Sequence, residues 1–583
     1  MRRQIRFSDY TRPLSPTFTY IMHDLIIHGA TVYDGLGNPP QRTDVAVSNG
    51  RIAAIGPDTG AARTTVEAGG LALMPGIVDL HTHYDAQVTW DRTMSPSPAL
   101  GVTTAVIGNC GFGIAPCPAP VRETMMKNLS VVEGMDLNAL MQGTRWEFET
   151  FGQYMDQLRR TGPYLNTAVF AGHSVIRTAV MGEAASEKVE PSDAELAAMR
   201  AQVREAMDAG AIGFASSFSP NHSGYGGRPM PSTIASEAEL RALTGVLGDV
   251  GRGVFMSATG TRASPDMMES IAASTGRPVF ISTVLTMYNE AAPARCLEYY
   301  ERCSQAIARG NEMVILTSCQ ALSFDFTLSD PYVLLSHSAF DAIQGVARDQ
   351  LASVYRDASF RAAFRANLAS PKSGILFLGN WDRIEVSVAA NAANRALEGC
   401  TVGALARDRH ADPVDVFFDL ACEENLDTHF IGKFFQNVDE GVAPLLKHPA
   451  GVVTLSDAGA HLIYMCDAGF GLHFLSHWVR DTGHFTLAEG IRRLTSDCAQ
   501  RFRIPERGRL IEGAPADLLL FDPATVGISK PYAVSDLPGG GSRMVRTSQG
   551  VHGVWVNGVM IHDGKHYVEH AKGPGHVLDR FDV

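Results

Sequence analysis

Between about residues 75 and 505, short apolar segments alternate with longer amphipathic ones. The apolar segments have the length and composition of buried strands, and in chain order they are IVDLHTH, TTAVIGNC, NTAVFAGH, AIGFASSF, GVFMSAT, PVFISTV, EMVILTS and VVTLSDAG. The segments between them favour helices; residues 192–209, for example, place alanine, leucine and methionine on one face. Eight strand–helix units predict an α/β fold, a TIM-type (β/α)8 barrel whose site lies at the carboxyl ends of the strands.

Both ends of the chain have the pattern of short strands joined by turns. Residues 22–70 alternate apolar and polar positions between glycine and asparagine turns, and the C-terminal end repeats this pattern. We therefore expect a small β-sandwich formed from both chain termini. The expected boundaries are an N-terminal tail at 1–21, sandwich parts at 22–74 and 505–583, and the barrel at 75–504. Residues 320–350 follow the seventh strand without a clear periodicity and are a candidate lid.

The composition is that of a globular protein, with 45% hydrophobic and 19% charged residues among 583. A formal net charge of −13, without a basic stripe, argues against nucleic acid as a partner. No run of 18 apolar residues exists, which argues against a membrane span. Nine dispersed cysteines without a CxxC pair indicate reduced thiols and a cytoplasmic location. The sequence leaves the oligomeric state open.

The first predicted strand ends in His81-Thr82-His83. In a strand, residues i and i+2 point to the same side, so both imidazoles face one point. Neutral imidazoles are good ligands for zinc and similar divalent ions. Two ordinary histidines at a strand end are the competing interpretation. The position on the opening strand of a predicted barrel favours metal binding.

Asp457 ends the eighth predicted strand, which neighbours the first in a closed barrel. A carboxylate there can take a proton from a water molecule and return it to a leaving amine. Helix capping by Ser456 or Asp457 is the competing interpretation. The proximity to the first strand favours catalysis.

Four segments, LMPGIVDLHTHYDAQVTWD, GVTTAVIGNCGFGIAP, TLSDAGAH and RGRLIEGAPADLLLFDP, resemble the N-acyl-D-amino-acid deacylase (D-aminoacylase) branch of the amidohydrolase superfamily. The resemblance covers nearly the whole chain from Met22. It implies a TIM-like barrel with a β-sandwich from both termini, and zinc-dependent hydrolysis of an amide. It also implies His81 and His83 as metal ligands, Cys110 as a thiolate ligand, and Asp457 as the catalytic acid/base at the metal.

Three positions depart from the family pattern. The family has a histidine at the ends of strands 5 and 6, where this sequence has Ala258 and Thr283. The family's lysine two residues further on corresponds to Leu285. We therefore expect an altered site with one divalent ion per chain, most simply zinc, and an altered substrate. A neutral or apolar acyl amide suits such a pocket better than an N-acyl amino acid.

Five further residues are candidate ligands or substrate contacts. His173, His222 and His461 could complete the metal site, whereas Arg177 and Arg228 could bind a substrate carboxylate. A structural hydrogen bond, a surface loop and a helix start are the respective competing interpretations for the histidines.

The preferred function is therefore metal-dependent hydrolysis of a linear amide C–N bond in a small molecule. The same scaffold could instead cleave esters, lactones or cyclic amides, because fold alone does not decide between them. A metal-free pseudoenzyme or ligand-binding protein is a further alternative, favoured by the two missing histidines.

Overall fold

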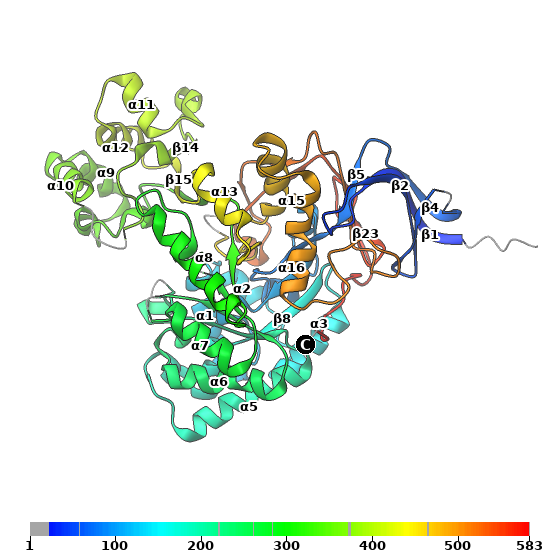
Figure 1. Cartoon of the computed structure of the whole chain (residues 1–583). Coiled ribbons are helices and arrows are strands. Elements are labelled where there is room, and N and C mark those ends of the chain that lie inside the picture. Colours follow the sequence, from blue (N-terminus) through cyan, green and yellow to red (C-terminus); the bar gives the residue numbers. More distant parts are fainter. Residues whose placement is uncertain are drawn as a thin grey trace, which may run out of the picture.

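The computed structural model describes residues 22–57, 59–219, 222–260, 262–282, 284–370, 375–462 and 466–581. The predicted tail at 1–21 lies outside the described residues. At the centre is a curled parallel sheet surrounded by helices, the arrangement of a TIM-type barrel (Figure 1). In spatial order its strands are β16 (Gly451–Val453), β12 (Met313–Thr317), β11 (Val279–Ser282), β10 (Val254–Ala258), β9 (Gly213–Ser217), β8 (Asn166–Gly172), β7 (Val102–Ile107) and β6 (Ile77–Asp79).

These strands coincide with the eight predicted from the sequence. Every residue of β7, β8, β9 and β10 is buried, as expected for a parallel sheet with both faces covered. A parallel bridge between Thr82 and Ala458 joins the chain just beyond β6 to the chain just beyond β16. The first and last strands of the sheet therefore meet at their carboxyl ends.

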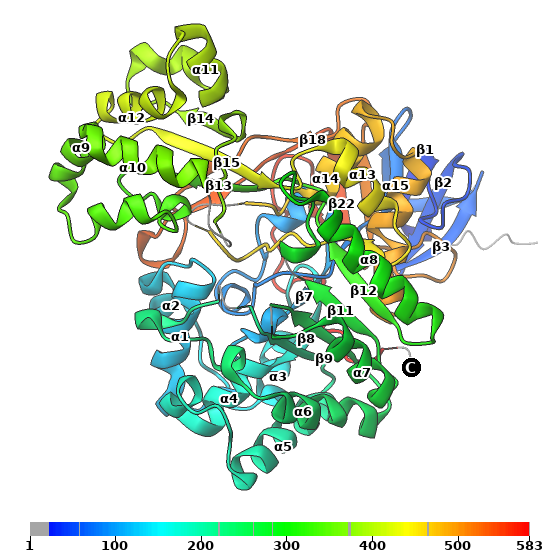
Figure 2. The same cartoon turned by 60° about the vertical axis from the view of Figure 1, so that its left-hand side comes forward.

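The helices of the barrel lie outside the strands in both Figure 1 and Figure 2. They are α1 (Arg122–Val132), α2 (Leu137–Gly143), α3 (Phe151–Thr161), α4 (His173–Met181), α5 (Asp193–Ala209), α6 (Glu237–Val250), α7 (Pro265–Thr275), α8 (Pro293–Ala308), α13 (Asp439–Lys447), α14 (Phe470–His473), α15 (Leu487–Leu494) and α16 (Ser496–Arg501). Helix α5 illustrates how the sequence sets their ends. Ser192 and Glu195 form a capping box at its start, and Gly210 adopts a left-handed conformation (φ 102°) at its end.

Between β12 and α13 the chain forms a separate lobe that stands apart from the barrel (Figure 2). Its elements are β13 (Leu322–Phe326), α9 (Arg348–Arg356), α10 (Ala358–Ala369), β14 (Ile384–Val388), α11 (Val402–Arg409), α12 (Pro413–Glu423) and β15 (His429–Phe435). The strands form a three-stranded antiparallel sheet in the order β13-β15-β14. An aromatic-rich core of its own, including Phe340, Tyr355, Phe364, Phe417 and Phe418, holds the lobe together. The candidate lid at 320–350 is the first part of this lobe.

Strands from the two ends of the described chain form one sheet. These are β1 (Met22–Val32), β2 (Gln41–Ser48), β3 (Arg51–Gly56), β4 (Ala61–Glu67), β5 (Ala72–Pro75), β17 (Leu518–Phe521), β22 (Val551–Val556) and β23 (Val559–His562). Strand β17 pairs antiparallel with β5 on one side and with β22 on the other, which joins the N-terminal and C-terminal strands. Leu25, Ile27, Val45, Leu518 and Trp555 belong to a small core of this sheet.

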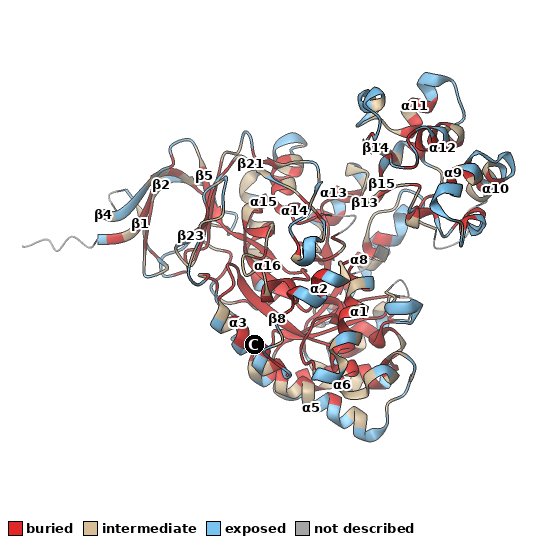
Figure 3. Ribbon diagram, turned by 180° about the vertical axis from the view of Figure 1, so that it is seen from behind, coloured by how far each residue is buried: buried red, intermediate tan, exposed pale blue. Residues whose placement is uncertain are grey.

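Buried residues concentrate on the central strands and on the inward faces of the helices (Figure 3). In the part of the chain that the structure describes, no helix combines the length and the apolar character needed to cross a membrane. All nine cysteines lie in that part, and each is a free thiol.

Candidate metal centre

Contacts between the ends of β6 and β16 bring three polar side chains together. The N–H of Asp457 donates to the carbonyl of His81 at 3.1 Å, and the N–H of His83 donates to the carbonyl of Ala458 at 2.7 Å. Atom Nε2 of His81 lies 3.1 Å from Oδ1 of Asp457, and Nε2 of His83 lies 3.5 Å from the same oxygen. Both imidazoles therefore point one nitrogen at a single carboxylate oxygen, as the alternation along a strand predicts.

Cys110 completes this group from the loop after β7. Its Sγ lies 3.5 Å from Nε2 of His81, and the ligand atoms of His81, His83 and Cys110 all lie within 4.8 Å of one another. Cys110 and Asp457 have left-handed backbones, with φ of 55° and 49°. This conformation is uncommon for residues other than glycine, and such strain gathers at functional sites. We call His81, His83, Cys110 and Asp457 the metal cluster.

Burial and mutual charge set the protonation of the metal cluster. Burial, opposed in part by Asp457, lowers the pKa of His81 to about 4. Burial acts in the same direction on His83, but Glu133 and Asp457 outweigh it and hold its pKa well above the ordinary value. Burial would raise the pKa of Asp457, but His81 and His83 outweigh it and hold that pKa below its usual range. Burial raises the pKa of the Cys110 thiol to about 11, so a nearby cation would be needed to ionise it at neutral pH.

The metal cluster fits a divalent cation. His81, His83 and Cys110 are buried, with 1%, 4% and 6% of their surfaces exposed, whereas the side chain of Asp457 is 23% exposed. Imidazole, thiolate and carboxylate are the ligands that zinc and related transition metals take in proteins. Three buried donors with one carboxylate facing more open space match a catalytic site, in which one side must admit the substrate.

Sequence reasoning missed Glu133, the residue directly after α1. Its side chain is buried, with Oε1 3.1 Å from Nδ1 of His83, and burial raises its pKa to about 7. Its carbonyl accepts the N–H of His461. The sequence offers no periodic signal for this position, since Glu133 lies in a turn between two helices.

Two of the candidate histidines lie beside the metal cluster. His222, in the loop after β9, hydrogen-bonds Ser217 Oγ through Nδ1 at 2.6 Å and packs against Phe112, with 5.1 Å between ring centroids. Burial, together with the nearby His461 and His83, lowers the pKa of His222 to about 3. Burial also lowers the pKa of His461, which Asp457 opposes.

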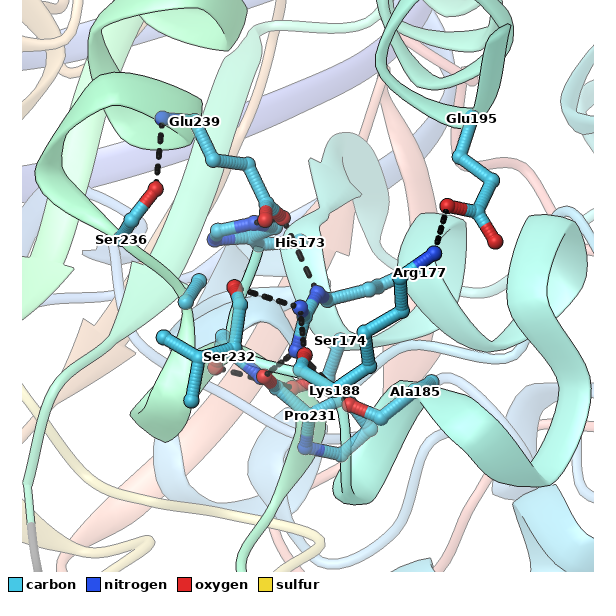
Figure 4. A network of polar contacts seen from close by, with 12 residues as sticks. His173, Ser174, Arg177, Ala185, Lys188, Glu195, Pro231, Ser232, Ser236 and Glu239 are labelled. Carbon is cyan, nitrogen blue, oxygen red and sulfur yellow. Dashed lines mark hydrogen bonds and ion pairs between the residues drawn. The ribbon is translucent and has the colours of Figure 1, made fainter. Parts of the chain in front are cut away.

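The other candidate histidine, His173, lies in a buried network (Figure 4). Its Nδ1 hydrogen-bonds Ser216 Oγ at 2.8 Å, and its Nε2 hydrogen-bonds Glu239 Oε1 at 2.9 Å. Arg177 lies 3.1 Å from the same Glu239 oxygen through Nε and donates to the carbonyls of Ala185, Lys188, Val189 and Pro231. This placement differs from the expectation for His173 and Arg177, because their polar atoms already have partners inside the protein.

Replacing Arg177 with methionine should lower the free energy of unfolding by about 3–5 kcal/mol, because it leaves a buried carboxylate without its cation. The measurement is urea denaturation followed by circular dichroism. Arg228→Met is the matched control, since Arg228 is half-exposed and lies 3.6 Å from Glu187 at the surface. Equal stability of the two variants would show that the network does not support the fold.

The remaining predicted positions lie as follows. Arg228 is in the surface loop that carries His222, and it has no contact with the metal cluster among the described residues. Ala258 ends β10 as expected, and Leu285 lies in a short helical turn, η8 (Val284–Thr286), after β11. Thr283 lies outside the described residues.

Comparison with known proteins identifies the family. The model of the amidohydrolase family matches residues 64–562. The chain belongs to this family. The family predicted from the sequence is thereby confirmed, and the protein is an amidohydrolase.

Among the curated relatives of this amidohydrolase are two deacylases from Alcaligenes xylosoxydans xylosoxydans. A D-aminoacylase is 27% identical over 96% of this chain and 98% of its own length. An N-acyl-D-aspartate deacylase is 28% identical over 95% of each chain. A solved D-aminoacylase structure aligns with a TM-score of 0.63 and 25% identity, covering 96% of this chain and 100% of that chain. That D-aminoacylase has a binuclear metal centre, with one-metal activation and second-metal attenuation. These relatives support a divalent metal in this family.

Proposed function

We propose that this amidohydrolase is a metal-dependent hydrolase of linear amide C–N bonds in a small molecule, with one zinc ion per chain. The observation that carries the proposal is the convergence of His81, His83, Cys110 and Asp457 at the carboxyl ends of the barrel strands. These four residues would hold the ion. When bound, a divalent cation polarises the amide carbonyl and lowers the pKa of a water molecule.

The protein's own part in the reaction begins at Asp457. Its carboxylate is ionised at neutral pH, because the neighbouring histidines hold its pKa below the usual range. It is also the most exposed member of the metal cluster. It can therefore take a proton from the attacking water and deliver it to the leaving amine.

His222 is placed to stabilise negative charge on the substrate oxygen. Its Nδ1 is held by Ser217, which leaves Nε2 for another partner. Burial keeps its imidazole neutral, since the pKa is lowered to about 3. A neutral imidazole held in this way can donate a hydrogen bond to a developing oxyanion. His461 is a second candidate for the same role.

The charges around the metal cluster favour a substrate without a carboxylate. The groups that lower the pKa of Asp457 are histidines, and Leu285 stands where the deacylases carry a lysine. Arg177 is already engaged in the buried network. Among the described residues, no lysine or arginine forms an ion pair with the metal cluster, so a substrate carboxylate would be desolvated next to Asp457 and Glu133 without such a side chain to receive it.

A matched substrate pair tests this proposal. We expect the neutral amide of an N-acyl-D-amino acid to be hydrolysed with a kcat/KM at least about tenfold above that of the free acid, because a buried charge without a partner is costly. The measurement is initial rates with both compounds. A clear preference for the free acid would refute the altered specificity. If only esters, lactones or cyclic amides in a wider panel are hydrolysed, the proposal that the substrate is a linear amide is refuted.

We further propose that the terminal sheet is a small β-sandwich and that the lobe containing residues 320–350 acts as a lid. The small core of the terminal sheet supports the first proposal. The second is supported by the insertion of the lobe between β12 and α13, close in sequence to the carboxyl end of β12. The free thiols support the cytoplasmic location.

A further inference from the structure

Glu133 is a buried carboxylate next to the metal cluster for which the proposed chemistry gives no role. Only 2% of its surface is exposed. A buried carboxylate is costly unless it has a partner. The contact that the structure provides is Nδ1 of His83, which lies 3.1 Å from Oε1. Neither atom forms an aligned hydrogen bond with any described residue, each other included, so this 3.1 Å contact is the polar contact that the structure gives to both.

The two nitrogens of His83 face opposite sides. Its Nε2 points at Asp457 and the centre of the metal cluster, whereas its Nδ1 points at Glu133. An imidazole binds a metal through a nitrogen that carries no proton, so its remaining proton must sit on the other nitrogen. A carboxylate facing Nδ1 favours the tautomer with the proton there, because it accepts the N–H.

We infer that Glu133 is a positioning residue, which fixes the orientation and tautomer of His83 so that Nε2 faces the cation. This inference rests on the proposed function. Because Glu133 faces the nitrogen on the far side of the ring, it acts on the metal through His83 and does not bind it directly. Metal ligands of this kind typically pass their second N–H to a carboxylate or carbonyl.

Two backbone contacts hold Glu133 in place for this role. Its N–H donates to the carbonyl of Leu129 at 3.0 Å, which fixes it to the end of α1. Its carbonyl accepts the N–H of His461, in the turn that follows Asp457. The residue thus joins the segment after β7 to the turn after β16. Nδ1 of His81 is also buried with no hydrogen-bond partner among the described residues, but no carboxylate of those residues lies within ion-pair distance of it, so Glu133 serves His83 alone.

The test measures metal affinity and coordination separately from turnover. The variants are Glu133→Gln, which keeps the shape and removes the charge, and Glu133→Leu, which removes the acceptor. The control is Glu239→Gln, because Glu239 is an equally buried carboxylate on a histidine, 2.9 Å from His173, in the network outside the metal cluster. The dissociation constant for Zn²⁺ is measured by competition with a chromophoric chelator, and the visible spectrum is recorded with Co²⁺.

We expect Zn²⁺ to bind about 10- to 100-fold more weakly to Glu133→Leu, with a smaller loss in Glu133→Gln and none in Glu239→Gln. The Co²⁺ spectrum of Glu133→Gln should keep the wild-type bands, since the ligands are unchanged. Wild-type affinity in both Glu133 variants would overturn the inference, and so would an equal loss in Glu239→Gln. Altered Co²⁺ bands would make Glu133 a ligand instead. If Glu133→Leu does not fold, the near-isosteric Glu133→Gln decides. Absence of metal binding by the wild type would refute the proposed function itself.

Discussion

Replacing Asp457 with asparagine should lower kcat for a small amide by about 10²- to 10⁴-fold, the usual contribution of a positioned acid/base. Asparagine keeps the size and one oxygen of the side chain, but it cannot accept a proton from water at neutral pH. His81, His83 and Cys110 remain to hold the cation, so the metal content should stay near that of the wild type. Steady-state rates and elemental analysis of the same preparation measure the two quantities.

Asp439→Asn is the matched control for this variant. Asp439 also pairs with a histidine, lying 2.8 Å from Nε2 of His477, but it does so at the start of α13, outside the metal cluster. Its loss should leave kcat close to the wild-type value. If the Asp457 variant keeps full activity, Asp457 has no part in proton transfer. If it loses its metal together with its activity, its main role is that of a ligand.

The sequence predicts the barrel and the metal cluster because both depend on local rules. Strand periodicity places His81 and His83 on one side, and the closure of a parallel barrel places Asp457 beside them. The positions of the strand ends in the sequence are therefore enough to predict where the site lies. The family pattern then adds Cys110, whose left-handed backbone no strand rule predicts.

Other features depend on contacts that no local pattern encodes. Glu133 follows α1, far from His83 in the sequence, and only the tertiary fold brings the two side chains to 3.1 Å. His173 follows a strand end just as the metal-cluster residues do, yet its ring is held by Glu239, which is distant in sequence. A position at a strand end thus predicts that a residue lies near the carboxyl end of the barrel. It does not predict which way the side chain points, because packing decides that direction. For the same reason, the sequence of the lobe shows a long insertion but not its antiparallel sheet.

The double variant His81→Ala/His83→Ala should lose its metal and its turnover together. The two imidazoles supply two of the four donors, and the remaining thiol and carboxylate are both on loops. Cys110 is moreover protonated at neutral pH unless a cation is close, because burial raises its pKa to about 11. Removing the histidines therefore weakens the remaining donors as well.

Elemental analysis of protein purified without added metal should give roughly one zinc per wild-type chain and almost none in the double variant, as expected for a four-donor site. The control is His173→Ala, which removes a buried histidine outside the metal cluster and should keep its metal if it folds.

Close to two metals per wild-type chain would mean that further residues hold a second ion, and His222 and His461 are the first candidates. Metal retained by the double variant would place the binding site elsewhere in the chain. Wild-type protein that takes up no metal even after reconstitution would favour the pseudoenzyme, since nothing else in the metal cluster can polarise an amide carbonyl.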